Sequence, residues 1–262
     1  MPPSGPVTIA KDESIIRSGN RYGFAGNPSA KSVNCSQSYE SKYQLLRSTQ
    51  QQTLLSCLEG LCPKDTQYPR ARVDSVYFDT RDWKLLSNKL ESDFIKLKVR
   101  LRWYSDPIHH VCDPSVFLEI KRRVGSQREK RRLLFPVSGT EISERGCDME
   151  VVRLVHELLP ELGMTVPAGL FPAFEVRYHR SRFVDFTTQS RLSIDSQITV
   201  PTVFPTRGSS NYQPNLENVI LELKGPVANL PRHLSKIETV GLRKSSFSKF
   251  ATCANNILHL KF

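Results

Sequence analysis

The segment KLKVRLRWY, residues 96–104, places a basic side chain at every second position. The cations are Lys96, Lys98, Arg100 and Arg102, and the positions between them hold Leu97, Val99, Leu101 and Trp103. Successive side chains of a β-strand point to opposite faces of a sheet, so this pattern predicts a strand with one cationic face and one apolar face. Taken alone, the segment also fits a half-buried strand whose basic face is solvated.

Four more segments repeat this alternation of charged and apolar residues. Their charged faces carry Glu119, Lys121 and Arg123; Arg128, Lys130 and Arg132; Arg191, Ser193 and Asp195; and Glu222 and Lys224. If all of these faces pointed outward, the amphipathic helices of the chain would have no apolar surface to cover. If the charged faces instead point inward and the apolar faces point outward, the helices can pack on the apolar faces and every segment has a place in the fold. The sequence therefore predicts a channel lined by charged side chains.

The other patterns predict an α+β fold. Strands are expected over 73–78, 94–104, 116–123, 130–137, 173–183, 191–198 and 219–224. Apolar residues at helical spacing predict helices over 43–61 and 151–162, with weaker patterns over 230–240 and 248–260. Long strands with few helices between them favour antiparallel pairing. Residues 1–36, rich in Pro, Ser and Gly, predict a flexible tail before a domain over 37–262.

Composition points to an anionic partner. The 262 residues include 37 Lys and Arg against 26 Asp and Glu, a formal net charge of +11. Nucleic acid, an anionic membrane and phosphorylated small molecules all satisfy this excess. The six cysteines show no metal-ligand spacing and are expected to be reduced. No apolar stretch reaches the length of about 18 residues typical of a membrane helix, and the start lacks a signal-peptide core, so a cytoplasmic protein is expected.

The spacing of the cations narrows the choice of anion. Same-face neighbours on a strand lie about 6.5–7 Å apart, and each buried pair of cations costs about 2–2.5 kcal/mol at an effective dielectric near 20. A linear polyanion matches such a row better than a compact monoanion. Glu119, Asp195 and Glu222 would repel that chain unless a divalent cation bridges them, which indicates Mg²⁺ or Mn²⁺ and disfavours nucleic acid as the main partner.

Nine motifs in order resemble the polyphosphate polymerase domain of the vacuolar transporter chaperone (VTC) family, within the CYTH-like triphosphate tunnel metalloenzymes. They are YESKY (39–43), SVYFDT (75–80), KVRLRWY (98–104), FLEIKRR (117–123), EKRR (129–132), VRYHR (176–180), SRLSID (190–195), LELK (221–224) and FSKF (247–250). The resemblance implies a closed antiparallel barrel of about eight strands with flanking helices. It also implies transfer of the γ-phosphoryl group of ATP to a growing polyphosphate chain.

The resemblance assigns roles to individual residues. Those implied at the transferring phosphate are Lys249, Arg100, Arg102 and Lys121, and those implied to bind the chain are Lys42, Lys98, Lys130, Arg180, Arg191 and Lys224. Glu222 is the implied ligand of Mn²⁺ or Mg²⁺, with Glu119 as a second. Glu40 is either a further ligand or the partner in an ion pair within its strand.

Several alternatives stay open on the sequence. The same lining would serve a tripolyphosphate or triphosphate hydrolase, or a polyphosphate-binding module without catalysis. Trp103 is interpreted as core and Asp79 as a strand-end cap, against nucleobase stacking and metal binding. His109 and His110 are interpreted as loop residues. The sequence does not determine the oligomeric state.

Overall fold

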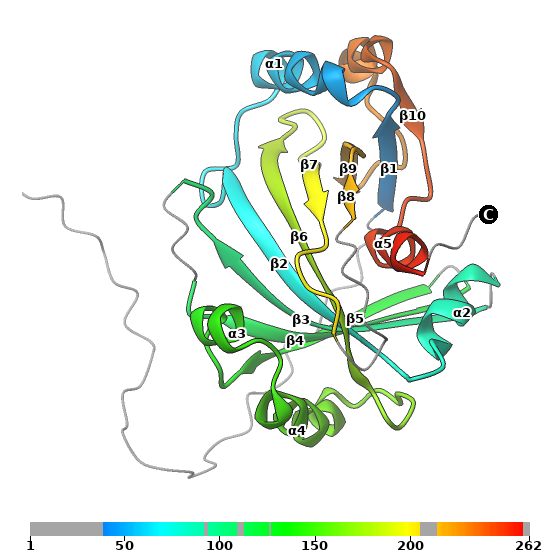
Figure 1. The fold of residues 1–262 in the computed structure, drawn as a ribbon. Helices are drawn as coiled ribbons and strands as arrows, with labels where there is room; N and C mark the ends of the chain where they lie inside the picture. The colour runs from blue at the N-terminus through cyan, green and yellow to red at the C-terminus, as the bar shows by residue number, and fades with distance from the viewer. Residues whose placement is uncertain (1–38, 92–93, 109–112, 126, 205–213, 259–262) are drawn as a thin grey trace, which may run out of the picture. The chain divides into compact units, whose positions relative to one another are not determined.

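A computed structural model describes residues 39–91, 94–108, 113–125, 127–204 and 214–258 (Figure 1). The predicted tail over residues 1–36 lies outside the described residues. His109 and His110 lie outside them too.

Within these described ranges, ten strands form one antiparallel sheet. They are β1 (Tyr39–Leu45), β2 (Arg70–Asp79), β3 (Ile95–Ser105), β4 (Val116–Val124), β5 (Gln127–Phe135), β6 (Phe171–Val184), β7 (Arg191–Thr199), β8 (Asn215–Leu216), β9 (Ile220–Gly225) and β10 (Leu242–Lys244). Their order is β10-β1-β9-β7-β6-β2-β3-β4-β5, and β8 pairs with β7. The predicted antiparallel α+β architecture is confirmed.

The expected closed barrel of about eight strands is wrong, because the described sheet is open between β5 and β10. The outer edge of β1 pairs with β10 over Tyr43–Leu45, and within the described residues β5 pairs with neither β1 nor β10. The sheet nevertheless curls far enough for an ion pair to join Arg128 of β5 to Glu40 of β1 at 3.5 Å. The two edges therefore face one another across a seam.

Helices pack around this sheet (Figure 1). They are α1 (Gln51–Leu61), α2 (Lys84–Leu90), α3 (Gly139–Arg145), α4 (Met149–Leu158) and α5 (Lys249–Ile257), with 3-10 turns η1 (Ser48–Gln50), η2 (Leu159–Leu162) and η4 (Arg232–Val240). The predicted helix over 43–61 is correct from Gln51 onward. Its first residues belong to β1, where Tyr43 and Leu45 alternate with polar residues and are buried.

Two helices were not predicted, and polar groups fix where both begin. Ser138 and Glu141 form a capping box at the start of α3. The carboxylate of Asp79 accepts hydrogen bonds from the backbone N–H groups of Leu85 and Leu86 in α2. The interpretation of Asp79 as a cap at the strand end is therefore confirmed.

The apolar faces of the strands point outward, as predicted. On β3, Leu97, Val99, Leu101 and Trp103 are each at most 6% exposed. They belong to a core cluster that α4 helps to cover, and a second cluster joins the outer faces of β7 and β9 to α1 and η4. On the inner face, Phe250 of α5 stacks on Phe174 of β6 at a centroid distance of 5.7 Å. An aromatic plug therefore fills part of the interior.

Replacing Leu101 with alanine is expected to lower the free energy of unfolding by about 2–5 kcal/mol, because the fully buried side chain would leave a cavity beneath the helices. Equilibrium urea unfolding measures this change. The matched control is Leu46→Ala, since Leu46 is 63% exposed and its replacement is expected to change the free energy by less than about 0.5 kcal/mol. Equal losses in the two variants would contradict the outward orientation of β3.

Candidate functional site

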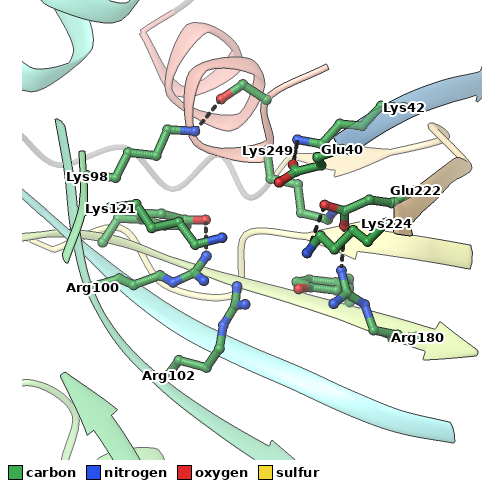
Figure 2. Close-up of a pocket in the computed structure, with 13 residues that line it drawn as sticks. Glu40, Lys42, Lys98, Arg100, Arg102, Lys121, Arg180, Glu222, Lys224 and Lys249 are labelled. Atoms are coloured by element: carbon green, nitrogen blue, oxygen red, sulfur yellow. Dashed lines mark hydrogen bonds and ion pairs between the residues drawn. The ribbon is translucent and has the colours of Figure 1, made fainter. Parts of the chain in front are cut away.

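A pocket on the inner face of the sheet gathers charged side chains from strands far apart in the sequence (Figure 2). Its lining residues are Glu40, Lys42, Tyr77, Lys98, Arg100, Arg102, Lys121, Tyr178, Arg180, Glu222, Lys224, Ser248 and Lys249. Eight of these are Lys or Arg and two are Glu, so the pocket favours a polyanion. Its empty space measures about 520 Å³, including the part that is open to solvent.

Ten of the thirteen predicted site residues line this pocket. Lys130, Glu119 and Arg191 do not. Lys130 is exposed and forms an ion pair with Glu119, which lies behind the lining. Arg191 is exposed at the start of β7, opposite Lys224 in the register. Sequence reasoning left out Tyr77, Tyr178 and Ser248, since these neutral residues carry no charge pattern.

Glu119 acts as a buried counter-ion. It is 1% exposed and accepts hydrogen bonds from Nε and Nη2 of Arg100 at 2.8 and 2.5 Å, while Lys130 pairs with its other oxygen. Burial would raise the pKa of Glu119, but Arg100, Arg102 and Lys130 hold it far below its usual range. Because Glu119 is buried behind the lining and does not face the pocket, it is poorly placed to bind the expected metal.

Glu40 and Glu222 fit a metal bound together with phosphate. Their strands pair so that Glu222 lies opposite Lys42, and the two carboxyl groups contact one another. Burial opposes ionisation of Glu222, yet Lys224 and Arg180 keep its pKa well below the usual value. The described residues contain no group of three acidic, His or Cys side chains able to hold a metal. Two carboxylates with phosphate oxygens and water suit Mg²⁺ or Mn²⁺.

Asp195 fixes two lining cations on the same side of the pocket as Glu222. This carboxylate is fully buried, accepts hydrogen bonds from Nε and Nη2 of Arg180 at 2.6 and 2.7 Å, and pairs with Lys249. The ammonium of Lys249 also lies 4.5 Å from the ring centroid of Tyr178. The alternation in SRLSID placed Asp195 on the charged face, but its link to Lys249, 54 residues away, was not predictable.

Three lining cations lack such a partner. Among the described residues, no carboxylate forms an ion pair with Lys98, Arg102 or Lys121. Lys98 instead donates to the Ser248 hydroxyl at 3.0 Å, and Arg102 donates to the Ser75 hydroxyl at 3.0 Å. These charges on β3 and β4 point across the pocket toward the wall of β1, β6 and β9 (Figure 2).

Both unpaired lysines have low pKa values. Burial, followed by repulsion from Lys42 and Arg100, lowers the pKa of Lys98 to about 7. Burial, followed by repulsion from Arg100 and Lys224, lowers the pKa of Lys121 to about 6. Near neutral pH both amines are therefore partly deprotonated, and a bound polyanion would favour their protonated forms.

The curled antiparallel sheet and its polybasic pocket define a polyanion-binding protein. The chain belongs to the VTC domain family, whose model matches residues 32–258. No match was found among curated proteins. Weakly similar solved structures include putative adenylate cyclases from Bacillus halodurans and Vibrio parahaemolyticus. The TM-scores are 0.47 and 0.42 and the identities 14% and 11%, over 80% and 85% of this chain and 95% and 97% of theirs. Likeness at this level assigns no function.

The Lys121→Met variant is expected to be more stable than the wild type without ligand and to bind tripolyphosphate about tenfold more weakly. The unfolded chain holds a proton that folded Lys121 has lost, so wild-type stability rises with pH between about 6 and 10. That slope should be smaller in the variant. Thermal melts across this pH range and calorimetric titration measure both effects. A variant that is less stable than the wild type at pH 7 would contradict the conclusion that no carboxylate compensates the charge of Lys121.

The Asp195→Asn variant is expected to have lower thermal stability, because Arg180 and Lys249 would be left buried without their shared counter-ion. We expect a loss of about 3–5 kcal/mol in the free energy of unfolding. Urea unfolding measures it. Asp65→Asn is the control, since Asp65 is only partly buried and its carboxylate accepts hydrogen bonds from the backbone N–H groups of Gln67 and Tyr68 in a turn. Similar losses in the two variants would exclude a central role for Asp195.

Proposed function

We propose that the protein is a metal-dependent polyphosphate polymerase that transfers the γ-phosphoryl group of ATP to the end of a polyphosphate chain. The observation that carries this proposal is the set of unpaired cations, Lys98, Arg102 and Lys121, facing a wall that holds Glu40 and Glu222. A bound chain would supply the missing negative charge. Membership of the VTC domain family supports a site for polyphosphate or a triphosphate.

Phosphoryl transfer mainly requires positioning and neutralisation of charge, and it needs little acid–base chemistry. Arg100, Arg102 and Lys121 form one side of the pocket and would hold the oxygens of the transferring group. Lys249, fixed by Asp195 and by the ring of Tyr178, would approach the same group from α5. Lys42, Lys98, Arg180 and Lys224 would bind the other phosphates. Mg²⁺ or Mn²⁺, held by Glu222 and Glu40, would neutralise phosphate charge.

A polyphosphate-binding module without catalysis is the second candidate. It is favoured by the absence, within the described residues, of any three-residue metal-ligand group. A triphosphate hydrolase would use the same pocket, and products distinguish it from a polymerase. None of the described helices has the length and apolar character needed to cross a membrane. A cytoplasmic location stays a prediction.

Incubation with ATP and Mn²⁺ is expected to yield long-chain polyphosphate and ADP. Glu222→Gln should reduce the rate on the order of 100-fold, because the variant loses a charged ligand at the transition state. Gel electrophoresis of the polymer and an ADP assay measure this. Glu157→Gln, which alters an exposed carboxylate of α4, is the control and should retain full activity.

Each product pattern selects one function. Release of free phosphate without formation of polymer would show that the protein is a hydrolase and not a polymerase. Polyphosphate binding that chelator leaves unchanged, with no turnover of ATP, would leave only the binding module.

A further inference from the structure

The basic inner face extends beyond the pocket along β3, β4 and β5. The strand register sets Lys98 opposite Lys121 and Lys121 opposite Lys130, so three cations form a row across the sheet. Two residues further along β3, toward Ile95, a second row begins: Lys96 lies opposite Arg123, and Arg123 lies opposite Arg128. We call this second row the outer row. Like charges directly opposite one another destabilise a sheet, so two consecutive cationic rows need an anionic partner.

Helix α2 adds a fourth cation to the outer row. It packs against β3, as Figure 1 also shows, and carries Lys89 near its end. Burial lowers the pKa of Lys89 first, followed by repulsion from Lys96, Arg123 and Lys42. Because Lys42 lines the pocket, Lys89 lies within electrostatic reach of both the outer row and the pocket.

The outer cations are poorly neutralised. Within the described ranges, neither Lys89 nor Lys96 forms an ion pair, and Arg123 donates from Nε to the carbonyl oxygen of Gly125 at 2.7 Å. Arg128 pairs with Glu40 at 3.5 Å. The outer row thus repeats the feature that marks the pocket as a ligand site, namely cations gathered on one inner face without enough carboxylates.

We propose that Lys89, Lys96 and Arg123 form a second subsite, which binds the phosphates of a polyphosphate chain too long for the pocket. This proposal rests on the proposed polyphosphate ligand. Lys96 and Lys98 project from the same face of β3, about 6.5–7 Å apart, so one extended chain can contact both rows. Longer chains therefore gain binding energy from the subsite, and short chains do not.

A polyphosphate chain fits these residues better than an anionic membrane does. Lys96 and Arg123 share the inner face with Lys98 and Lys121, and Lys89 and Lys96 are only partly exposed. A flat lipid surface would have to reach cations on the concave side of a curled sheet, whereas a thin chain leaving the pocket meets them directly. Exposed Phe94, next to this row, is the feature that favours a membrane.

The test compares ligand lengths in a double variant, Lys89→Gln with Lys96→Gln. The matched control, Arg232→Gln with Lys236→Gln, removes two exposed cations of η4, which covers the second core cluster. Calorimetry with chelator present would measure binding of tripolyphosphate and of polyphosphate of about 100 units. Thermal melts would confirm that both variants fold.

We expect the Lys89/Lys96 variant to bind tripolyphosphate within about twofold of wild type and the long chain about tenfold more weakly. The slope of log affinity against log salt for the long chain should fall in magnitude by about 1–1.5. The η4 variant should match wild type for both ligands.

Equal losses for both ligands, or no loss for either, would overturn the subsite. Loss of binding to vesicles containing anionic lipid, with polyphosphate binding intact, would assign the residues to a membrane and also overturn it. If the wild-type protein binds neither tripolyphosphate nor the long chain, both the subsite and the proposed function are overturned. Length-dependent binding without turnover of ATP would overturn only the polymerase.

Discussion

Partial neutralisation of buried positive charge is the constraint on which this structure depends. Three buried carboxylates, Glu119, Asp195 and Glu222, each pair with two cations and thereby allow a cationic face inside a folded sheet. The carboxylates do not reach Lys98, Arg102 or Lys121 among the described residues. The fold therefore keeps a charge imbalance that a polyanion can remove, at a cost to the stability of the ligand-free protein.

The inverted arrangement of the strands follows from this constraint. Since alternate residues face opposite sides, β3 can give its apolar residues to the helices and its cations to the interior in one register only. The two core clusters that join the outer faces to α1, α4 and η4 supply the apolar burial that the interior lacks. The aromatic plug of Phe174 and Phe250 limits how much of the interior stays polar.

The alternation of charged and apolar residues predicted β3 to within one residue at each end, because a period of two is visible in the sequence. The same alternation identified most of the residues that line the pocket. The sequence did not show that Tyr43–Leu45 belong to a strand, because the spacing of their apolar residues continues the helical spacing of α1. The pairing of β10 with β1 beside the open seam is a long-range choice of edge that leaves no local signal. The pairing of Asp195 with Lys249 is likewise set by the tertiary fold.

The two walls of the pocket differ in charge, and this difference indicates where the phosphate chain and the metal ion would each bind. Cations without carboxylate partners lie on β3 and β4, while Glu40 and Glu222 lie opposite them on β1 and β9. A chain in contact with the first wall would leave its remaining oxygens facing two carboxylates, where repulsion is relieved by a divalent cation between them. Binding of the chain and of the metal should therefore be cooperative, since each ligand removes the charge that opposes the other.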